Sequence, residues 1–201
     1  MFRNLSKIDC EELLAKDLIQ PSISSHSAPP FYVENHSEIK RGKRRMVIYK
    51  ALNEATIGDA HTLPRKDYFI SRIKGMKWFA SLDAKSGYYQ LRLHPNTIPL
   101  TAFSCPAEKL YEWKVLPFGL KQVPSIFQKY MSKNLEGLEE YCLVYIDDIL
   151  IFSKQDKEDH LQKLLTVLQR CKDRGIVLSK KKAQLCKQEI DFSWLNLTIY
   201  Y

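Results

Sequence analysis

Long apolar runs are missing from this sequence. The 201 residues are 45% hydrophobic, yet no stretch approaches the ~20 consecutive apolar residues that a membrane-spanning helix needs. The N-terminal segment MFRNLSKIDCEELL also lacks the uninterrupted apolar core of a secretory signal peptide. We therefore expect no membrane partner, and an intracellular location in the cytoplasm or the nucleus.

Cysteine is sparse, and its spacing argues against two kinds of cysteine-based scaffold. The five cysteines are far apart in the sequence and include no CxxC pair, and the five histidines are equally scattered. We therefore expect neither a disulfide framework nor a zinc knuckle, and a reducing compartment is favoured. The cysteines are Cys10, Cys105, Cys142, Cys171 and Cys186.

Acidic residues are outnumbered by basic ones. The chain has 31 Lys and Arg against 23 Asp and Glu, a net charge of +8 and a pI near 9.1. This balance favours an anionic partner, with nucleic acid first and a membrane surface second. A solvated basic surface explains the charge equally well. The segment KRGKRRMVIYK (40–50) concentrates six positive charges, and such runs are more often solvated turns than phosphate clamps.

Hydrophobic periodicity predicts an irregular alternation of helices and strands with no internal repeat. The length is sufficient for one core or for two small lobes that share one. The mixture favours an α+β domain with an antiparallel sheet and helices packed behind it. Helices are expected at 6–20, before Gly75, from Pro124 to Gly137 and within 153–175; strands are expected at 31–35, 46–50 and 88–94, as a hairpin within 101–116, as a pair within 141–152, and as a pair near the C-terminus.

Two helical stripes of apolar residues are expected to be core and to carry no chemistry. The first stripe is Phe127, Met131 and Leu135, and the second is Leu161, Leu164, Leu165 and Leu168.

Two adjacent aspartates interrupt the most apolar segment of the chain, YCLVYIDDILIF (141–152). Asp147 and Asp148 are consistent with a hairpin turn, where Asp is common, although the tightest turns favour a glycine that is absent here. They are also consistent with a metal site, because two neighbouring carboxylates repel each other unless a cation compensates. Oxygen ligands of this kind suit Mg²⁺. From these residues alone, both interpretations stay open.

A third carboxylate, Asp83, ends another apolar stretch in WFASLDAKSGYYQ. It could be an ordinary aspartate between a strand and a turn. If folding brought it to the Asp147–Asp148 pair, three carboxylates could hold two metal ions for an in-line phosphoryl displacement. Spacing in the sequence does not establish that proximity.

Several motifs occur in a characteristic order over about residues 11–192. They are LIQPSISSHSAPPFYVEN, KRGKRRMVIYKALNEATIGDAHTLP, SLDAKSGYYQLRLHP, PLTAFSCP, YEWKVLPFGLKQVPSIFQKYM, VYIDDILIFS and LSKKKAQL. In this order they resemble the reverse transcriptases of caulimovirus-type plant pararetroviruses and of long-terminal-repeat retroelement polyproteins. The YxDD motif alone is a weak signal, whereas the ordered set is highly specific.

The resemblance implies the fingers and palm of a right-hand polymerase. Residues 1–82 would be the N-terminal fingers region, and 83–201 the palm with an interleaved fingers segment at about 95–125. The chain would stop before the thumb, without the RNase H and protease of a polyprotein. The implied activity is that of an RNA-directed DNA polymerase, a nucleotidyltransferase that adds dNTPs to a primer 3′-hydroxyl on an RNA or DNA template. Two Mg²⁺ ions would serve it, with Mn²⁺ as a possible substitute.

The resemblance also implies roles for individual residues. Asp83, Asp147 and Asp148 would be catalytic and would hold both metal ions, with the carbonyl of Ala84 as a further ligand. Without the resemblance, Tyr88 is better explained as core and Lys180–Lys182 as a surface run, although phosphate contact by these lysines is an alternative. The implied dNTP-binding residues are Arg44 or Arg45, which would grip the triphosphate, Ala84, Tyr88, which would exclude a ribose 2′-hydroxyl, Phe118, where retroviral enzymes often carry glutamine, and Lys121.

The sequence departs from the family pattern in three places. RMVIYKALN is one residue short and lacks the usual Asn or Asp, and a one-residue loss in a strand would reverse the faces beyond it. CPAEKLYEW is one residue longer than usual. Ser193-Trp194 replaces Leu-Gly. Two other functions therefore remain open: an inactive, truncated relic of an integrated pararetrovirus or retroelement, and a residual nucleic-acid-binding module.

Overall fold

The chain folds into two units of interleaved sequence. The computed structural model describes residues 2–4, 7–29, 31–33, 45–47, 49–58, 63–105, 109–192 and 197–199. Unit 1 comprises residues 1–59 and 88–123, and unit 2 comprises residues 60–87 and 124–201. These units are defined by contacts, and the expected assignment of residues 1–82 to the fingers and 83–201 to the palm stays a prediction.

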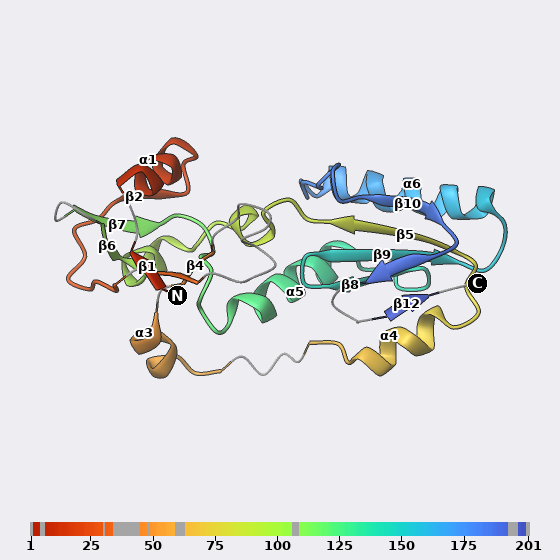
Figure 1. Cartoon of the computed structure of the whole chain (residues 1–201), viewed down its shortest axis with the longest axis horizontal. Coiled ribbons are helices and arrows are strands. Elements are labelled where there is room, and N and C mark those ends of the chain that lie inside the picture. Colours follow the sequence, from red (N-terminus) through yellow and green to blue (C-terminus); the bar gives the residue numbers. More distant parts are fainter. Residues whose placement is uncertain are drawn as a thin grey trace. The chain divides into compact units, whose positions relative to one another are not determined.

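Unit 1 contains two small antiparallel sheets (Figure 1). The first has the order β1-β3-β4 and the second the order β2-β7-β6. The elements are β1 (Phe2–Asn4), α1 (Lys7–Ala15), β2 (Ile19–Pro21), β3 (Phe31–Val33), β4 (Arg45–Val47), α3 (Lys50–Ala55), the 3₁₀ helix η2 (Pro95–Thr101), β6 (Phe103–Cys105) and β7 (Lys109–Trp113). The expected hairpin is thus confirmed as β6 and β7, which pair antiparallel.

The core of unit 1 is aromatic. Phe103 and Trp113 are 0% and 1% exposed, and their ring centroids lie 6.0 Å apart. Tyr89 stacks on Trp113 with ring centroids 5.4 Å apart. Aromatic pairs at such distances add to the free energy gained by burial alone.

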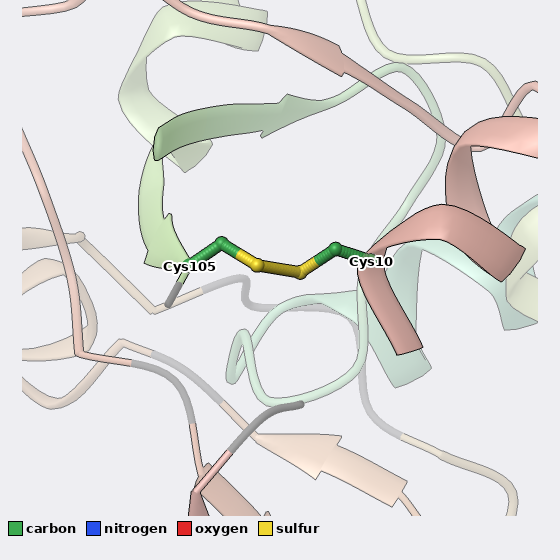
Figure 2. The surroundings of a disulfide bond; sticks show 2 residues. All are labelled: Cys10 and Cys105. Atoms are coloured by element: carbon green, nitrogen blue, oxygen red, sulfur yellow. A yellow bond between two sulfur atoms is a disulfide. The ribbon is translucent and has the colours of Figure 1, made fainter. Parts of the chain in front are cut away.

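Unit 1 contains one disulfide bond, which the spacing of the cysteines did not predict. Cys10 in α1 is bonded to Cys105 at the end of β6, across a sequence separation of 95 residues (Figure 2). Both cysteines are buried in the same core cluster. Spacing along the chain could not reveal this pair, because the packing of a helix against a distant hairpin brings the two side chains together. Cys142, Cys171 and Cys186 are free thiols.

Unit 2 is built on a four-stranded antiparallel sheet of order β10-β5-β9-β8 (Figure 1). Its elements are α4 (Lys66–Ile73), β5 (Trp78–Asp83), nearly all of α5 (Val123–Asn134), β8 (Cys142–Tyr145), β9 (Asp148–Ser153), α6 (Lys157–Asp173), β10 (Gln184–Lys187), and the hairpin of β11 (Ile190–Phe192) and β12 (Leu197–Ile199). None of the helices within these described ranges combines the length and apolar character needed to cross a membrane.

Large apolar side chains cover one face of this sheet. Phe79 of β5 lies opposite Phe152 of β9, and both are buried. Phe69 and Ile73 of α4 pack into the same cluster. Helix α6 packs against β5, β9 and β10. Helices α4 and α6 therefore cover an antiparallel sheet, which is typical of an α+β domain.

The expected apolar stripes are confirmed for one helix and wrong in part for the other. Phe127, Met131 and Leu135 are 0%, 0% and 3% exposed. In α6 the buried residues are instead His160, Leu164, Val167 and Cys171, whereas Leu165 is 58% exposed. The buried face of α6 is therefore rotated relative to the leucine stripe, and it includes a histidine and a cysteine.

The first expected helix ends earlier than predicted. The helix expected to run to residue 20 ends at Ala15, because Asp17 adopts a left-handed backbone with φ 55°, a common way for a helix to stop. Arg92 and Lys114 bind the carboxylate of Asp17. Ile19–Pro21 then pairs with β7 as a strand.

The strand expected at 88–94 is largely replaced by the 3₁₀ helix η1 (Gly87–Gln90). Only a bridge between Arg92 and Val115 remains of the strand pairing in this part of the described chain. Alternation of side chains predicted the wrong local structure here, because the chain turns immediately after β5.

Candidate active site

Asp147 lies in a tight hairpin loop between β8 and β9. Tyr145 pairs with Asp148, so Ile146 and Asp147 form the loop. The hairpin turn expected here is confirmed for Asp147, whereas Asp148 is the first residue of β9. Ile146 has φ 55°, and for a β-branched residue this left-handed backbone is a strained outlier that costs of order 1–3 kcal/mol.

A buried amide holds this strained loop. Gln128 of α5 is 1% exposed. Its Oε1 accepts a hydrogen bond from the backbone N–H of Ile146 at 2.7 Å, and its Nε2 donates to the carbonyl of Val144 at 3.1 Å. Sequence reasoning missed Gln128, although a polar residue beside Phe127 in an apolar helix is a signal that could have identified it.

Close packing fixes the loop from the other side. A Cβ atom on Gly87 would lie 3.1 Å from Cβ of Asp147 and 3.2 Å from the ring of Phe127. The backbone N–H of Ala84 donates to the carbonyl of Asp147 at 2.7 Å. The position of Asp147 therefore depends on the absence of a side chain at residue 87.

The fold brings Asp83 to the other two aspartates. Asp83 ends β5 and lies directly opposite Asp148, which begins β9. Residues paired in this way project from the same face of a sheet, with Cβ atoms about 4.5–5.5 Å apart. The proximity that the sequence could not establish is thus present, although Asp83 and Asp148 are 65 residues apart in the chain.

The cluster carries an excess of negative charge. The pKa of Asp148 is raised to about 7, first by burial and then by the charges of Asp147 and Asp83, while Lys182 opposes the rise. A carboxyl group in this state would be ionised more readily if a further cation were near.

Lys182 lies directly against the cluster. Its Nζ donates to Oδ2 of Asp83 at 2.5 Å. Backbone hydrogen bonds fasten the preceding segment to the end of β5: the N–H of Ser179 donates to the carbonyl of Asp83, and that of Lys85 to the carbonyl of Val177, each at 2.8 Å.

The oxygen atoms at this site are chemically suited to a divalent cation, but their present arrangement does not surround a common point. Three carboxylates and the carbonyl of Ala84 are oxygen ligands, which Mg²⁺ and Mn²⁺ prefer. Among the residues described, no three His, Cys, Asp or Glu side chains converge closely enough to hold a metal ion as they stand. The Ala84 carbonyl accepts a hydrogen bond from the N–H of Gly87 at 3.2 Å.

The other candidate residues lie in unit 1. The rings of Tyr88 and Phe118 are in contact, with centroids 4.9 Å apart. Lys121 is exposed, and its backbone N–H donates to Asn53 of α3, whose amide in turn donates to the carbonyl of Gly119. Tyr88 is half-buried and lies in η1, so it does not alternate with Tyr89 on a strand as the core interpretation assumed.

The candidates in the basic segment lie partly beyond what the structure describes. Arg45 pairs with Val33 in β4, while its side chain, Arg44 and Ser193-Trp194 lie outside the described residues. Tyr49 follows β4 by two positions and has φ 112°. This left-handed residue lies where the sequence is one residue shorter than the family pattern.

Known proteins resemble this chain along nearly its whole length. The family model for "Reverse transcriptase (RNA-dependent DNA polymerase)" matches residues 33–199. The "Enzymatic polyprotein" of Cestrum yellow leaf curling virus is 64% identical over 190 residues, which cover 94% of this chain and 30% of the polyprotein. That of Cauliflower mosaic virus (strain CM-1841) is 52% identical over 188 residues, 93% of this chain and 27% of the polyprotein. The chain thus spans less than a third of these relatives' length.

Solved structures share the fold. The native crystal structure of the prototype foamy virus protease-reverse transcriptase matches with a TM-score of 0.80 at 27% identity, over 98% of this chain and 26% of that one. The foamy viral protease-reverse transcriptase dRH in complex with double-stranded DNA matches with a TM-score of 0.83 at 24% identity, over 94% and 33%. The expected fold class, α+β fingers and palm with antiparallel sheets, is confirmed.

Proposed function

This chain belongs to the reverse transcriptase (RNA-dependent DNA polymerase) family, and from that premise we propose that it is the catalytic part of an RNA-directed DNA polymerase. Unit 1 would serve as fingers and unit 2 as palm. The observation that carries the proposal is the register of β5 and β9, which opposes Asp83 and Asp148 beside the loop that holds Asp147.

The aspartates have the roles of metal ligands in this proposal. Asp83, Asp147 and Asp148, with the carbonyl of Ala84, would hold two Mg²⁺ ions, or Mn²⁺ as a substitute. When bound, such ions favour ionisation of a primer 3′-hydroxyl and offset charge on the transferred phosphate. Gln128 and Gly87 act through Asp147: the amide holds the loop from one side, and the missing side chain leaves room for it on the other.

The candidates of unit 1 would bind the incoming dNTP. Tyr88, supported by Phe118, would occupy the space of a ribose 2′-hydroxyl and so select deoxynucleotides. Arg44 or Arg45 would contact the triphosphate, and Lys121 would face the nucleotide and template. Asn53 supports Lys121 by fixing its backbone.

The partners proposed are a primer, an RNA or DNA template and dNTPs. The net charge of +8 supports an anionic partner, and foamy viral structures of this fold include complexes with double-stranded DNA and with an RNA/DNA hybrid. Relatives of this chain are longer enzymatic polyproteins, so further polyprotein domains such as RNase H and protease belong to the proposal. We place the activity inside the cell, in the cytoplasm or nucleus, where dNTPs are available.

A single-nucleotide primer extension on an RNA template with Mg²⁺ tests the proposal. We expect extension by the parent chain and at least about a hundredfold loss in Asp147→Asn/Asp148→Asn, because metal ligands act in the transition state. The matched control is Asp67→Asn, whose carboxylate is 82% exposed on α4, and it should extend normally.

A folded parent chain that does not extend the primer would reject the activity for this chain. Retained, salt-sensitive binding of the same primer–template in EDTA would then favour a residual nucleic-acid-binding module. Loss of both extension and binding would favour an inactive relic.

A further inference from the structure

A cation from the protein itself already lies in the carboxylate cluster. Lys182 Nζ is 2.5 Å from Asp83 Oδ2, and its charge is one of those that act on Asp148. The two partners differ in exposure, since the side chain of Asp83 is 12% exposed and that of Lys182 is 47% exposed. The carboxylate is therefore fixed in the protein, while the ammonium group reaches it from the solvent side.

The backbone carries Lys182 to this position independently of its side chain. The segment before it is attached to the end of β5 by the Ala84–Leu178 bridge and by the Ser179–Asp83 backbone hydrogen bond. The N–H of Lys182 donates to the carbonyl of Ser179 at 3.2 Å, which closes the turn. After the turn, β10 pairs with β5. The backbone segments before and after this turn therefore both hold Lys182 next to Asp83.

The same turn supplies internal comparisons. Lys180 and Lys181 are exposed neighbours of equal charge in this lysine run. Among the described residues, the ion pair to Asp83 is made by Lys182. An effect of general positive charge on the site should therefore be shared by these lysines, whereas an effect of the direct contact should belong to Lys182.

We propose that Lys182 is a resident counterion of the carboxylate site and that a divalent cation must displace it from Asp83. The ammonium group neutralises Asp83 and occupies one of its oxygens. When a divalent ion binds, Lys182 swings into solvent, which its exposure permits at little cost. Lys182 accordingly weakens metal binding by the site; the inference rests on the proposed function, which makes Asp83 a metal ligand.

Direct binding of Mn²⁺, followed by the electron paramagnetic resonance signal of the free ion without nucleotide or primer, tests this. We expect Lys182→Met to bind Mn²⁺ about two- to fivefold more tightly than the parent chain, as loss of a competing, partly exposed ion pair allows. Lys182→Arg, which keeps the charge, should bind about as weakly as the parent, and Lys181→Met should change the affinity less than about twofold. Asp83→Asn should weaken the binding, which identifies the site that is measured.

Three results would overturn the proposal: unchanged binding in Lys182→Met, weaker binding in Lys182→Met, or equal tightening in Lys181→Met and Lys182→Met. Weaker binding would mean that Lys182 holds Asp83 in its ligating position, and equal tightening would mean a general effect of charge. Primer extension is a separate readout. A parent chain that does not extend a primer rejects the polymerase function, while the tightening in Lys182→Met still establishes the counterion.

Discussion

At the residue scale, the candidate site depends on side chains that carry no catalytic chemistry. Ile146 is held in a left-handed conformation that its branched side chain disfavours. The hydrogen bond to buried Gln128 is one of the interactions that support this conformation. Removing one partner of a buried hydrogen bond leaves the other unsatisfied, which costs more than the bond itself contributes.

Replacing Gln128 with leucine should therefore affect both stability and activity. In Gln128→Leu we expect the free energy of unfolding to fall by about 1–3 kcal/mol, and primer extension to fall further because the loop that carries Asp147 relaxes. Urea denaturation and single-nucleotide extension measure the two effects. Gln169→Leu, on the exposed face of α6, is the matched control and should change neither. Normal extension by a destabilised Gln128→Leu would contradict the positioning role.

The raised pKa of Asp148 predicts how the stability of the ion-free chain depends on pH. The folded state holds a proton on Asp148 up to about pH 7, whereas an unfolded aspartate loses it near about 3.9. The folded state therefore binds more protons in this window, and its stability falls as the pH rises from about 4 to 7. In EDTA, Asp148→Asn should lack this contribution, so its advantage over the parent should grow between pH 5 and 8 in chemical denaturation.

His160 does not disturb the comparison of stability between the parent chain and Asp148→Asn. Burial lowers the pKa of His160, so its own contribution to stability is lost as the pH falls below the unfolded value, the opposite slope. Both proteins contain His160, and its effect cancels in their difference. A difference between parent and Asp148→Asn that does not vary with pH would contradict the assigned shift.

At the element scale, periodicity predicted the elements with strong signals and failed where a specific contact decided. The helix from Pro124, the hairpin around the two aspartates and the final long helix were predictable from apolar spacing and from Gly137 and Gly175. The early end of α1 was not, because Asp17 adopts a left-handed backbone and Ile19–Pro21 pairs with the distant strand β7. The three aspartates could be named from sequence. That Asp83 lies opposite Asp148 became known only from the register of β5 and β9.

The disulfide that joins α1 to β6 gives a prediction at this scale. In non-reducing denaturant, thiol titration should find three free cysteines of the five, Cys142, Cys171 and Cys186. Reduction should lower the free energy of unfolding by about 2–4 kcal/mol, because the bond closes a long loop. The double variant Cys10→Ser/Cys105→Ser should be insensitive to reductant. Five titrating thiols in the untreated protein would mean that the bond does not form in solution.

At the scale of the whole molecule, charge and family were accessible from sequence, while the division into units was not. The ordered motifs gave the family, which the match over residues 33–199 bears out. The segment from α4 to β5 precedes the second stretch of unit 1 in the sequence yet belongs to unit 2, where β5 pairs with β9 and β10. A strand's membership depends on partners that lie far away in sequence.

The excess of positive charge predicts salt-dependent binding of nucleic acid by the whole chain. If the net charge of +8 contacts phosphates, affinity for a primer–template should fall at least about tenfold between 50 and 200 mM salt, through release of counterions. Fluorescence anisotropy at several salt concentrations measures the slope. An affinity that does not change with salt would assign the basic residues to a solvated surface.

The interleaving of the two units also sets an order of events during synthesis on the ribosome. Strand β5 emerges early, but its partner β9 begins 65 residues later, at Asp148. Until then the apolar edge that contains Phe79 has no neighbouring strand, and such edges invite pairing with other chains. We therefore expect a chain that ends between β5 and Asp148 to aggregate more readily than the whole chain.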